Sequence, residues 1–242
     1  MIISTSKRTF KTVVFFLTLF CSNLFTTVKS FNHPFLRPIT KIESDHYQII
    51  YNKLDLQQEG LSKEAFDYAI KGFEKLIANK SLLNDSILSI IDFTKPSSQK
   101  RFFILDLNHQ NLLLKTYVAH GKHSGLLYAT AFSNRNTSFQ SSLGFYETAS
   151  TYIGKHGYSL ALTGFEKGFN DQIANRTIVI HGAPYVNDDF INKNGYLGRS
   201  LGCPAVPQNQ SAAIINLIKG GSCLFVYAAN SNYINSSKLL ND

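Results

Sequence analysis

After its first thirty residues the sequence has no long hydrophobic run, and no later segment approaches the length of a membrane-spanning helix. It also lacks an internal repeat at the period of a solenoid or a propeller. The net charge of +8 favours anionic partners in general, but the lysines are scattered and form no dense run among aromatic residues, so nucleic acid is not expected as a partner. With 44% hydrophobic and 17% charged residues, the 242 residues predict one globular domain with short appendages.

Cysteine is scarce, and its three copies differ in context. Cys21 follows Phe20, which is too large for a lipoprotein processing site. Cys203 lies in a turn between a glycine and a proline, whereas Cys223 is embedded in an apolar run. In an oxidising compartment two cysteines suggest one disulfide. The contrast in context instead favours a reactive Cys203 and a structural Cys223.

The N-terminal segment has the order of a secretory signal. Basic residues within positions 7–11 precede the apolar run 13–20, and polar residues resume at Ser22. The apolar run is too short to span a bilayer comfortably. We therefore expect residues 1–30 to be a signal peptide, with an uncleaved anchor as the alternative. The protein would then be exported to the periplasm or cell-wall zone, and would contact the membrane only through this segment.

The rest of the chain predicts a mainly β domain with peripheral helices. Residues 31–86 combine an irregular lead-in, which contains Pro34 and Pro38, with a helix that Ser62 caps and that places apolar residues from 66 to 77 on one face. Short apolar runs then predict strands at 87–93, 101–107, 112–119 and 177–180, a helix at 210–219 and a last strand at 223–229. We expect the main domain to span residues 87–230 and residues 231–242 to form a C-terminal tail.

His181 and Cys203 are candidates for a base and a nucleophile, since each lies beside a glycine at a strand end or in a turn. A thiol with a pKa of roughly 8.5 is mostly protonated at neutral pH, and a neighbouring histidine can take its proton. The histidine must be oriented through its other ring nitrogen, and peptide N–H groups beside the nucleophile can hold an oxyanion.

Other interpretations start from the same residues. His120, His123 and His156 flank glycines and could line a cleft, although an ordinary polar loop position is the default expectation. A zinc site built from these histidines, or from His181, with Cys203 lacks a compact ligand spacing, so no metal site is expected from these residues. A papain-type peptidase usually places its cysteine before its histidine, which is the opposite of the order here.

The stretch from about Ser89 to Tyr227 resembles the murein L,D-transpeptidase catalytic domain, the YkuD-like family. The signature of that family is His-Gly, a spacer, and Ser/Thr-x-Gly-Cys, which corresponds here to His181-Gly182 and to residues 200–203. An upstream family element is echoed in residues 141–146. The branch in which Pro-Ala-Val follows the cysteine also carries runs similar to residues 132–134, 152–157 and 176–181.

The resemblance implies a YkuD-like β-sandwich and a covalent mechanism. Cys203 would be the acylated nucleophile and His181 the general base, with the carbonyl of Gly182 orienting the imidazole. The amides of Gly202 and Cys203 would form the oxyanion hole. The substrate would be a peptidoglycan tetrapeptide stem, held as a thioester and transferred to an amine or to water. The resemblance likewise implies that neither a metal nor an organic cofactor is needed. The alternatives are an L,D-carboxypeptidase and an inactive wall-binding module.

The resemblance is weaker for the substrate contacts. The family commonly has an arginine shortly after the cysteine, and this sequence lacks it, which makes Arg199 a candidate substitute. Leu201 replaces a common histidine, and the spacer is longer than usual. The substrate-binding candidates are Ser200, Arg199, Tyr185, Tyr146 and Gly144.

Overall fold

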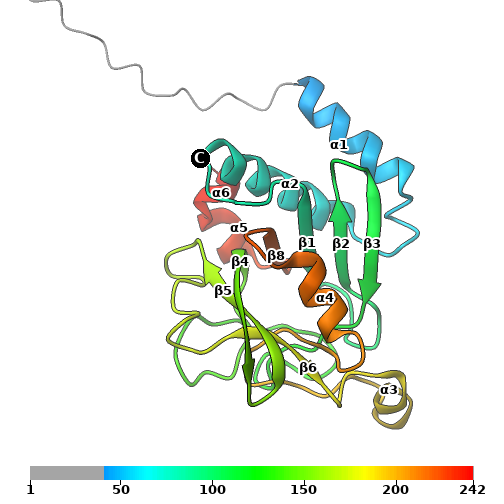
Figure 1. Cartoon of the computed structure of the whole chain (residues 1–242), viewed down its shortest axis with the longest axis vertical. Helices are drawn as coiled ribbons and strands as arrows, with labels where there is room; N and C mark the ends of the chain where they lie inside the picture. The colour runs from blue at the N-terminus through cyan, green and yellow to red at the C-terminus, as the bar shows by residue number, and fades with distance from the viewer. Residues whose placement is uncertain (1–40, 242) are drawn as a thin grey trace, which may run out of the picture. The chain divides into compact units, whose positions relative to one another are not determined.

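The structure, a computed structural model, describes residues 41–241, with side chains from His46 onward (Figure 1). The predicted signal segment and the two prolines of the lead-in lie outside these residues. The strands are β1 (Ile87–Asp92), β2 (Phe102–Asp106), β3 (Asn111–Thr116), β4 (Gly144–Gly154), β5 (Gly157–Gly164), β6 (Val179–Ala183), β7 (Ala205–Pro207) and β8 (Cys223–Tyr227). The helices are α1 (Lys41–Lys53), α2 (Lys63–Ala78), α3 (Asp188–Asn194), α4 (Ser211–Ile218), α5 (Ser231–Ser236) and α6 (Lys238–Asn241).

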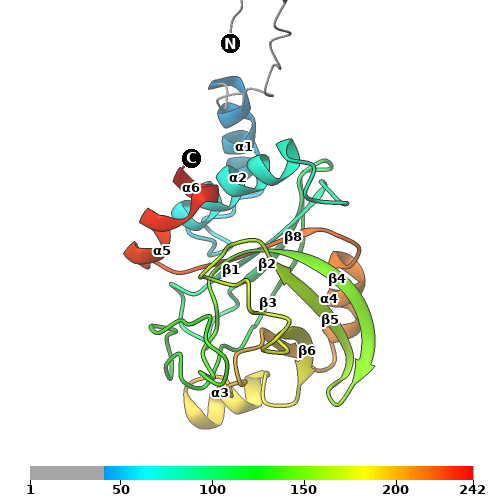
Figure 2. The same ribbon diagram turned by 90° about the vertical axis from the view of Figure 1, so that its left-hand side faces the viewer.

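The eight strands form one hydrogen-bonded sheet in the order β3-β2-β1-β8-β4-β5-β6-β7. The β1–β8 and β6–β7 pairs are parallel, and the other pairs are antiparallel. A bulge between Thr148 and Thr151 breaks the β4–β5 register, and these two strands form a long curved hairpin (Figure 2). The mainly β prediction is confirmed. The predicted sandwich is not confirmed, because the strands belong to a single continuous sheet.

Helix α2 packs against the central strands β1 and β8. The Ser62 side chain accepts from the N–H of Ala65 and caps the helix, as predicted. The predicted apolar face is buried, including Phe66 and Phe73. Gly72 lets the ring of Phe145 approach, because a Cβ there would lie 2.1 Å from the ring carbon Cζ. The helix therefore braces the centre of the sheet.

The lead-in and the C-terminal segment are more ordered than predicted. The prediction of an irregular lead-in is wrong for residues 41–53, which form helix α1. Ile50 and Tyr51, in the last turn of this helix, are buried, and the ring centroids of Tyr51 and Phe66 lie 5.0 Å apart. The prolines that suggested irregularity precede this helix. Residues 231–241 form α5 and α6, which bury Tyr233 and Leu240.

Most predicted strands are confirmed with ends that shift by a few residues: β1, β2, β3 and β8, as well as helix α4. Strand β6 begins two residues later than predicted and continues through His181 to Ala183. The β4–β5 hairpin and α3 were not predicted. None of the helices within residues 41–241 combines the length and apolar character that crossing a membrane requires.

Candidate active site

The pairing of β6 with β7 brings the two signature motifs together. His181 lies on β6 opposite Ala205 of β7, and the strands run in parallel. Cys203 lies two residues before Ala205, in the turn that leads into β7. This local pairing, rather than sequence spacing, brings the histidine and the cysteine to the same end of the sheet.

The hydrogen bond of His181 defines which ring nitrogen is available. Its Nδ1 lies 2.9 Å from the carbonyl oxygen of Gly182. A carbonyl only accepts, so Nδ1 carries the proton and Nε2 keeps a free lone pair. This is the arrangement that the resemblance implied for Gly182. Gly182 is also constrained, because a Cβ at this position would lie 2.8 Å from Oγ of Ser211.

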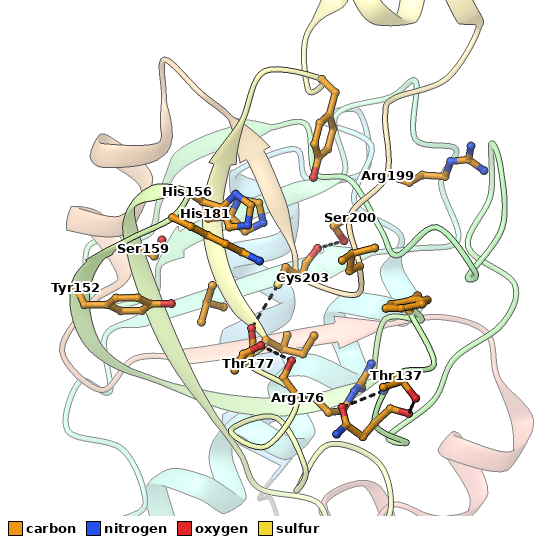
Figure 3. A pocket seen from close by; sticks show the side chains of 17 residues that line it. Thr137, Tyr152, His156, Ser159, Arg176, Thr177, His181, Arg199, Ser200 and Cys203 are labelled. Carbon is orange, nitrogen blue, oxygen red and sulfur yellow. Dashed lines mark hydrogen bonds between the residues drawn. The ribbon is translucent and has the colours of Figure 1, made fainter.

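His156, at the tip of the β4–β5 hairpin, covers one face of His181. The two rings stack with centroids 4.2 Å apart and planes at 19° (Figure 3). Burial lowers the pKa of His181, and the charges of His156 and Lys155 lower it further, against the opposing effect of the Gly182 hydrogen bond. His181 is therefore neutral near pH 7, which is the form that a general base requires.

Ser200 holds the turn that presents Cys203. Its hydroxyl donates to the carbonyl of Cys203 at 2.6 Å and accepts from the N–H of Gly202 at 3.0 Å. Gly202 has a φ of 127°, and a Cβ there would lie 2.9 Å from the carbonyl oxygen of Gln140. Both the backbone conformation and the space favour glycine at this position.

The thiol of Cys203 points toward a backbone carbonyl. Its Sγ lies 3.7 Å from the oxygen of Thr177, and within the described part of the chain no hydrogen bond joins it to His181. Thr177 has a φ of 51°, which is strained for a β-branched residue. Burial raises the pKa of the Cys203 thiol, while the N–H of Val179 and the charge of Arg176 act in the opposite direction. The resting thiol is therefore protonated.

Cys203 and His181 line one cavity of about 480 Å³ (Figure 3). The cavity wall comes from the loop before β4, the β4–β5 hairpin, β6 with the residues before it, and the turn before β7. The lining residues are Asn136, Thr137, Phe139, Tyr152, Lys155, His156, Ser159, Arg176, Thr177, Ile178, Val179, His181, Tyr185, Arg199, Ser200, Leu201 and Cys203.

Tyr185 and Arg199, two of the predicted substrate-binding residues, both line the cavity, but they have different neighbours. Tyr185 packs against Gly198, where a Cβ would lie 2.5 Å from the tyrosine Cβ. Burial, and to a smaller degree Cys203, raises the pKa of Tyr185 to about 12, so its hydroxyl stays protonated and can donate. The guanidinium of Arg199 lies over the Tyr196 ring and points away from Cys203 (Figure 3).

Tyr146 and Gly144, which were predicted to bind substrate, are buried and lie outside the lining of this cavity. Tyr146 is 2% exposed, does not line the cavity, and donates to the carbonyl of Ser142 at 3.0 Å. Gly144 has a φ of 109°, and a Cβ there would lie 2.2 Å from Oε2 of Glu166. That carboxylate accepts from the N–H of Phe145, so Gly144 makes room for a buried hydrogen bond.

Two groups near Cys203 that were predicted to contact substrate make hydrogen bonds within the turn instead. The N–H of Gly202 donates to Ser200, so this amide is not available to an oxyanion in this conformation. Ser200 likewise uses its hydroxyl within the turn rather than toward a substrate. The peptide N–H groups of Val179 and Cys203 lower the pKa of the Cys203 thiol.

The three histidines that flank glycines, His120, His123 and His156, lie in different parts of the structure. His120 is fully buried, its Nδ1 lies 2.8 Å from the guanidinium of Arg101, and its pKa is lowered to about 4 by burial and by that arginine. His123 is exposed and outside the cavity. His156 is the exception to the default expectation, because it lines the cavity. Over residues 41–241, no three His, Cys, Asp or Glu side chains come together as a metal ion would require.

Cys203 and Cys223 are both free thiols, so the disulfide alternative is wrong. Cys223 lies on β8 in the core, where burial raises the pKa of its thiol strongly. Cys203 is partly exposed in the cavity. The two cysteines have the different environments that their sequence contexts predicted.

Sequence reasoning assigned no role to Lys155 or Arg176, although both lie in runs that carried the resemblance. Arg176 joins the loop before β4 to the start of β6: it donates to the carbonyl oxygens of Ser133 and Gln140, each at 2.6 Å, and to the hydroxyl of Ser142. No local pattern in the sequence predicts these contacts, because they depend on the path of a loop some forty residues earlier.

The comparisons with solved structures gave low identities. An L,D-transpeptidase from Mycobacterium smegmatis is 15% identical with a TM-score of 0.37, over 59% of this chain and 59% of that chain. L,D-transpeptidase 3 from Mycobacterium tuberculosis is 11% identical with a TM-score of 0.37, over 59% and 61%. The helical cell shape determining protein Pgp2 from Campylobacter jejuni, in a variant form, is 13% identical with a TM-score of 0.40, over 60% and 48%.

This chain thus spans less than two thirds of the length of these solved structures. No curated protein matches it. The L,D-transpeptidase catalytic domain family, by contrast, matches residues 57–227, from the end of the lead-in through β8. Since this match covers well over half of the sequence and includes both signature motifs, the protein belongs to the L,D-transpeptidase catalytic domain family.

Proposed function

We propose that the protein is a peptidoglycan L,D-transpeptidase that forms a thioester between Cys203 and a tetrapeptide stem. One observation carries the proposal: Cys203 and a neutral His181, whose Nδ1 is held by Gly182, line the same cavity. The family membership supplies the reaction class and the peptidoglycan substrate. An L,D-carboxypeptidase would share the first half of the reaction and use water in the second.

The first half-reaction needs movement of the thiol. Because Sγ rests against the carbonyl of Thr177, the side chain turns so that Nε2 of His181 takes the thiol proton. The sulfur then attacks the carbonyl carbon between the third and fourth stem residues. The N–H groups of Val179 and Cys203, which lower the pKa of the thiol, are the donors that we expect to stabilise the developing oxyanion.

Collapse of this intermediate completes the exchange. The C–N bond breaks, the imidazolium of His181 gives its proton to the leaving amine, and D-alanine departs. The acyl group stays on Cys203 as a thioester. An amine from another stem then attacks the thioester, His181 takes its proton, and the thiol is released with the new peptide bond formed.

We also propose that residues 1–30 export the protein to the periplasm or cell-wall zone, where this substrate lies. The order of basic, apolar and polar residues in that segment supports the proposal. The mass of the exported protein tests it, since cleavage removes the segment and an uncleaved anchor retains it.

Intact-mass spectrometry after incubation with a carbapenem tests the nucleophile. We expect one covalent adduct on the wild-type protein and none on Cys203→Ala, because of the two cysteines within residues 41–241 only Cys203 is partly exposed and lines a cavity with His181. Cys223→Ala is the matched control and should keep the adduct, since the Cys223 thiol is buried in β8.

A folded, fully reduced wild-type protein that forms no adduct would contradict the nucleophile assignment. The wall-binding module would then be favoured. If the adduct forms, hydrolysis and transfer of tetrapeptide stems distinguish the carboxypeptidase from the transpeptidase.

A further inference from the structure

The cavity is lined by cations and by no carboxylate. Among the described residues, Lys155, Arg176 and Arg199 contribute side chains to its wall, and no aspartate or glutamate does. In a partly closed space without compensating acids, cations attract an anionic group of the substrate. The three cations differ in the contacts that each already makes with the rest of the protein.

Arg176 forms hydrogen bonds with the loop before β4. Besides its bonds to Ser133, Gln140 and Ser142, it donates to Oγ of Ser138 at 3.2 Å. Its side chain is mostly buried, with 8% of the residue exposed. Binding a substrate carboxylate would require it to give up bonds that hold the cavity wall.

Arg199 contacts Tyr196 and Gly125. Its guanidinium carbon lies 5.5 Å from the centre of the Tyr196 ring, and its Nη1 donates to the carbonyl of Gly125 at 3.4 Å. The side chain points away from Cys203 (Figure 3). The sequence made Arg199 the candidate for holding the substrate carboxylate. Its contacts, however, hold the guanidinium over Tyr196 and away from Cys203.

Lys155 is the remaining cation. It lies in the turn between β4 and β5, next to His156, whose ring stacks on His181. It is exposed and has no hydrogen bond or ion pair with any residue in the described part of the chain. Its charge lowers the pKa of both Cys203 and His181, so it acts at the reacting groups.

We propose that Lys155 binds the carboxylate of the amine component of the reaction and so selects α-amino carboxylates as leaving group and as acceptor. The inference rests on the proposed function. In the first half-reaction the C–N bond to D-alanine breaks, and the carboxylate of D-alanine lies one carbon from that nitrogen. In the second, an amine attacks the same thioester carbon from the same side. One cation beside Cys203 and His181 therefore serves both steps.

The first test uses two alkylating reagents that differ only in charge, iodoacetate and iodoacetamide. Both react with the thiolate, so the ratio of their rates cancels any change in the thiol pKa. We expect Lys155→Met to lower the iodoacetate-to-iodoacetamide ratio at Cys203 by about 5-fold at low salt, the size of one cation acting on an anion at a partly exposed site.

Three variants make the alkylation result specific. Lys155→Arg should keep the ratio, because it retains the charge. Lys167→Met, at an exposed lysine outside the cavity, should leave it unchanged. An unchanged ratio in Lys155→Met, or a fall of similar size in Arg199→Met alone, would overturn the proposal.

The second test measures transfer to D-alanine and to D-alaninamide from the same tetrapeptide donor. The wild-type protein should prefer the acceptor with the carboxylate, and Lys155→Met should lose most of that preference and raise the KM for the donor more than it lowers kcat. A preference that survives in Lys155→Met overturns the selectivity. A wild-type protein that turns over no stem peptide overturns the proposed function instead, while the alkylation ratio still decides whether Lys155 binds the anion.

Discussion

Cys203 and His181 are both uncharged in the resting cavity. Burial raises the pKa of the thiol and lowers the pKa of the imidazole, so a preformed thiolate–imidazolium pair is disfavoured. The thiol instead donates to the carbonyl of Thr177. Under the proposed mechanism, Cys203 would therefore be activated by proton transfer when a substrate binds, rather than held permanently as a reactive thiolate.

The low pKa of His181 leads to a prediction about pH. The base works only when neutral, so kcat/KM should fall as the pH decreases through this lowered pKa. His156→Gln removes a stacked ring that shields His181 and a charge that lowers its pKa, so the pKa of His181 should rise toward the usual value near 6.5. The acid limb of the kcat/KM profile should then move to higher pH.

A pH-rate profile over about pH 4 to 8 measures this shift, and His123→Gln is its control because His123 lies outside the cavity. An acid limb that stays in place, or moves to lower pH, in His156→Gln would show that the stack does not control the base.

At the scale of elements, the site is built where several parts of the chain meet. The parallel β6–β7 pair brings together His181 on β6 and Cys203 in the turn before β7. The curved β4–β5 hairpin stacks His156 on His181 and brings Lys155 to the wall of the same cavity. Arg176 joins the loop before β4 to the residues that precede β6. Each element therefore contributes either a reacting group or the wall around it.

The C-terminal helices are connected to the start of β4 through a buried carboxylate. Glu166 accepts from the hydroxyl of Tyr233 at 2.9 Å, from the hydroxyl of Ser237, and from the N–H of Phe145 at 2.8 Å. Burial raises the pKa of Glu166, and these three hydrogen bonds oppose the effect. The folded state thus binds this proton more tightly than the unfolded chain does, and acidification through that pKa favours folding.

Tyr233→Phe should lower the free energy of unfolding by about 1–3 kcal/mol at neutral pH, because it removes one donor from a buried carboxylate. The loss should shrink as the pH falls and the carboxyl becomes protonated. Urea unfolding at several pH values measures it, with Tyr158→Phe as the control, whose hydroxyl contacts Asn216 near the surface. A loss no larger than that of the control, or one independent of pH, would contradict this role for Glu166.

At the scale of the whole molecule, neither of the two thiols in the described part of the chain forms a disulfide, and they differ in how deeply they are buried. If export removes residues 1–30, and Cys21 with them, we expect the mature protein to contain two thiols. One should react with a thiol reagent in the native state and the second only after denaturation, because Cys223 is fully buried. A spectrophotometric titration without reductant measures both counts. A denatured protein with no reactive thiol would indicate a disulfide instead.

The sequence predicted those elements of the fold that depend on local patterns of residues. Apolar runs predicted β1, β2, β3 and β8, and a cap with helical spacing predicted α2. Helix α1 was missed because two prolines before it suggested an irregular segment, while burial of Ile50 and Tyr51 is a tertiary effect. The β4–β5 hairpin was missed because its outer residues face solvent and the cavity, so no continuous apolar run marks its strands.

For the site, the sequence by itself indicated His181 and Cys203 as the candidate reacting residues, because each lies beside a glycine in a local motif that matches the family signature. The tertiary structure decided the residues around them. It buried Tyr146 and Gly144, placed Arg199 over the ring of Tyr196, and used the Gly202 amide within its own turn. It also stacked His156 on His181 and brought Lys155 to the cavity wall. Those contacts join segments that are distant in sequence, and only folding creates the burial and the charges that give each residue its role.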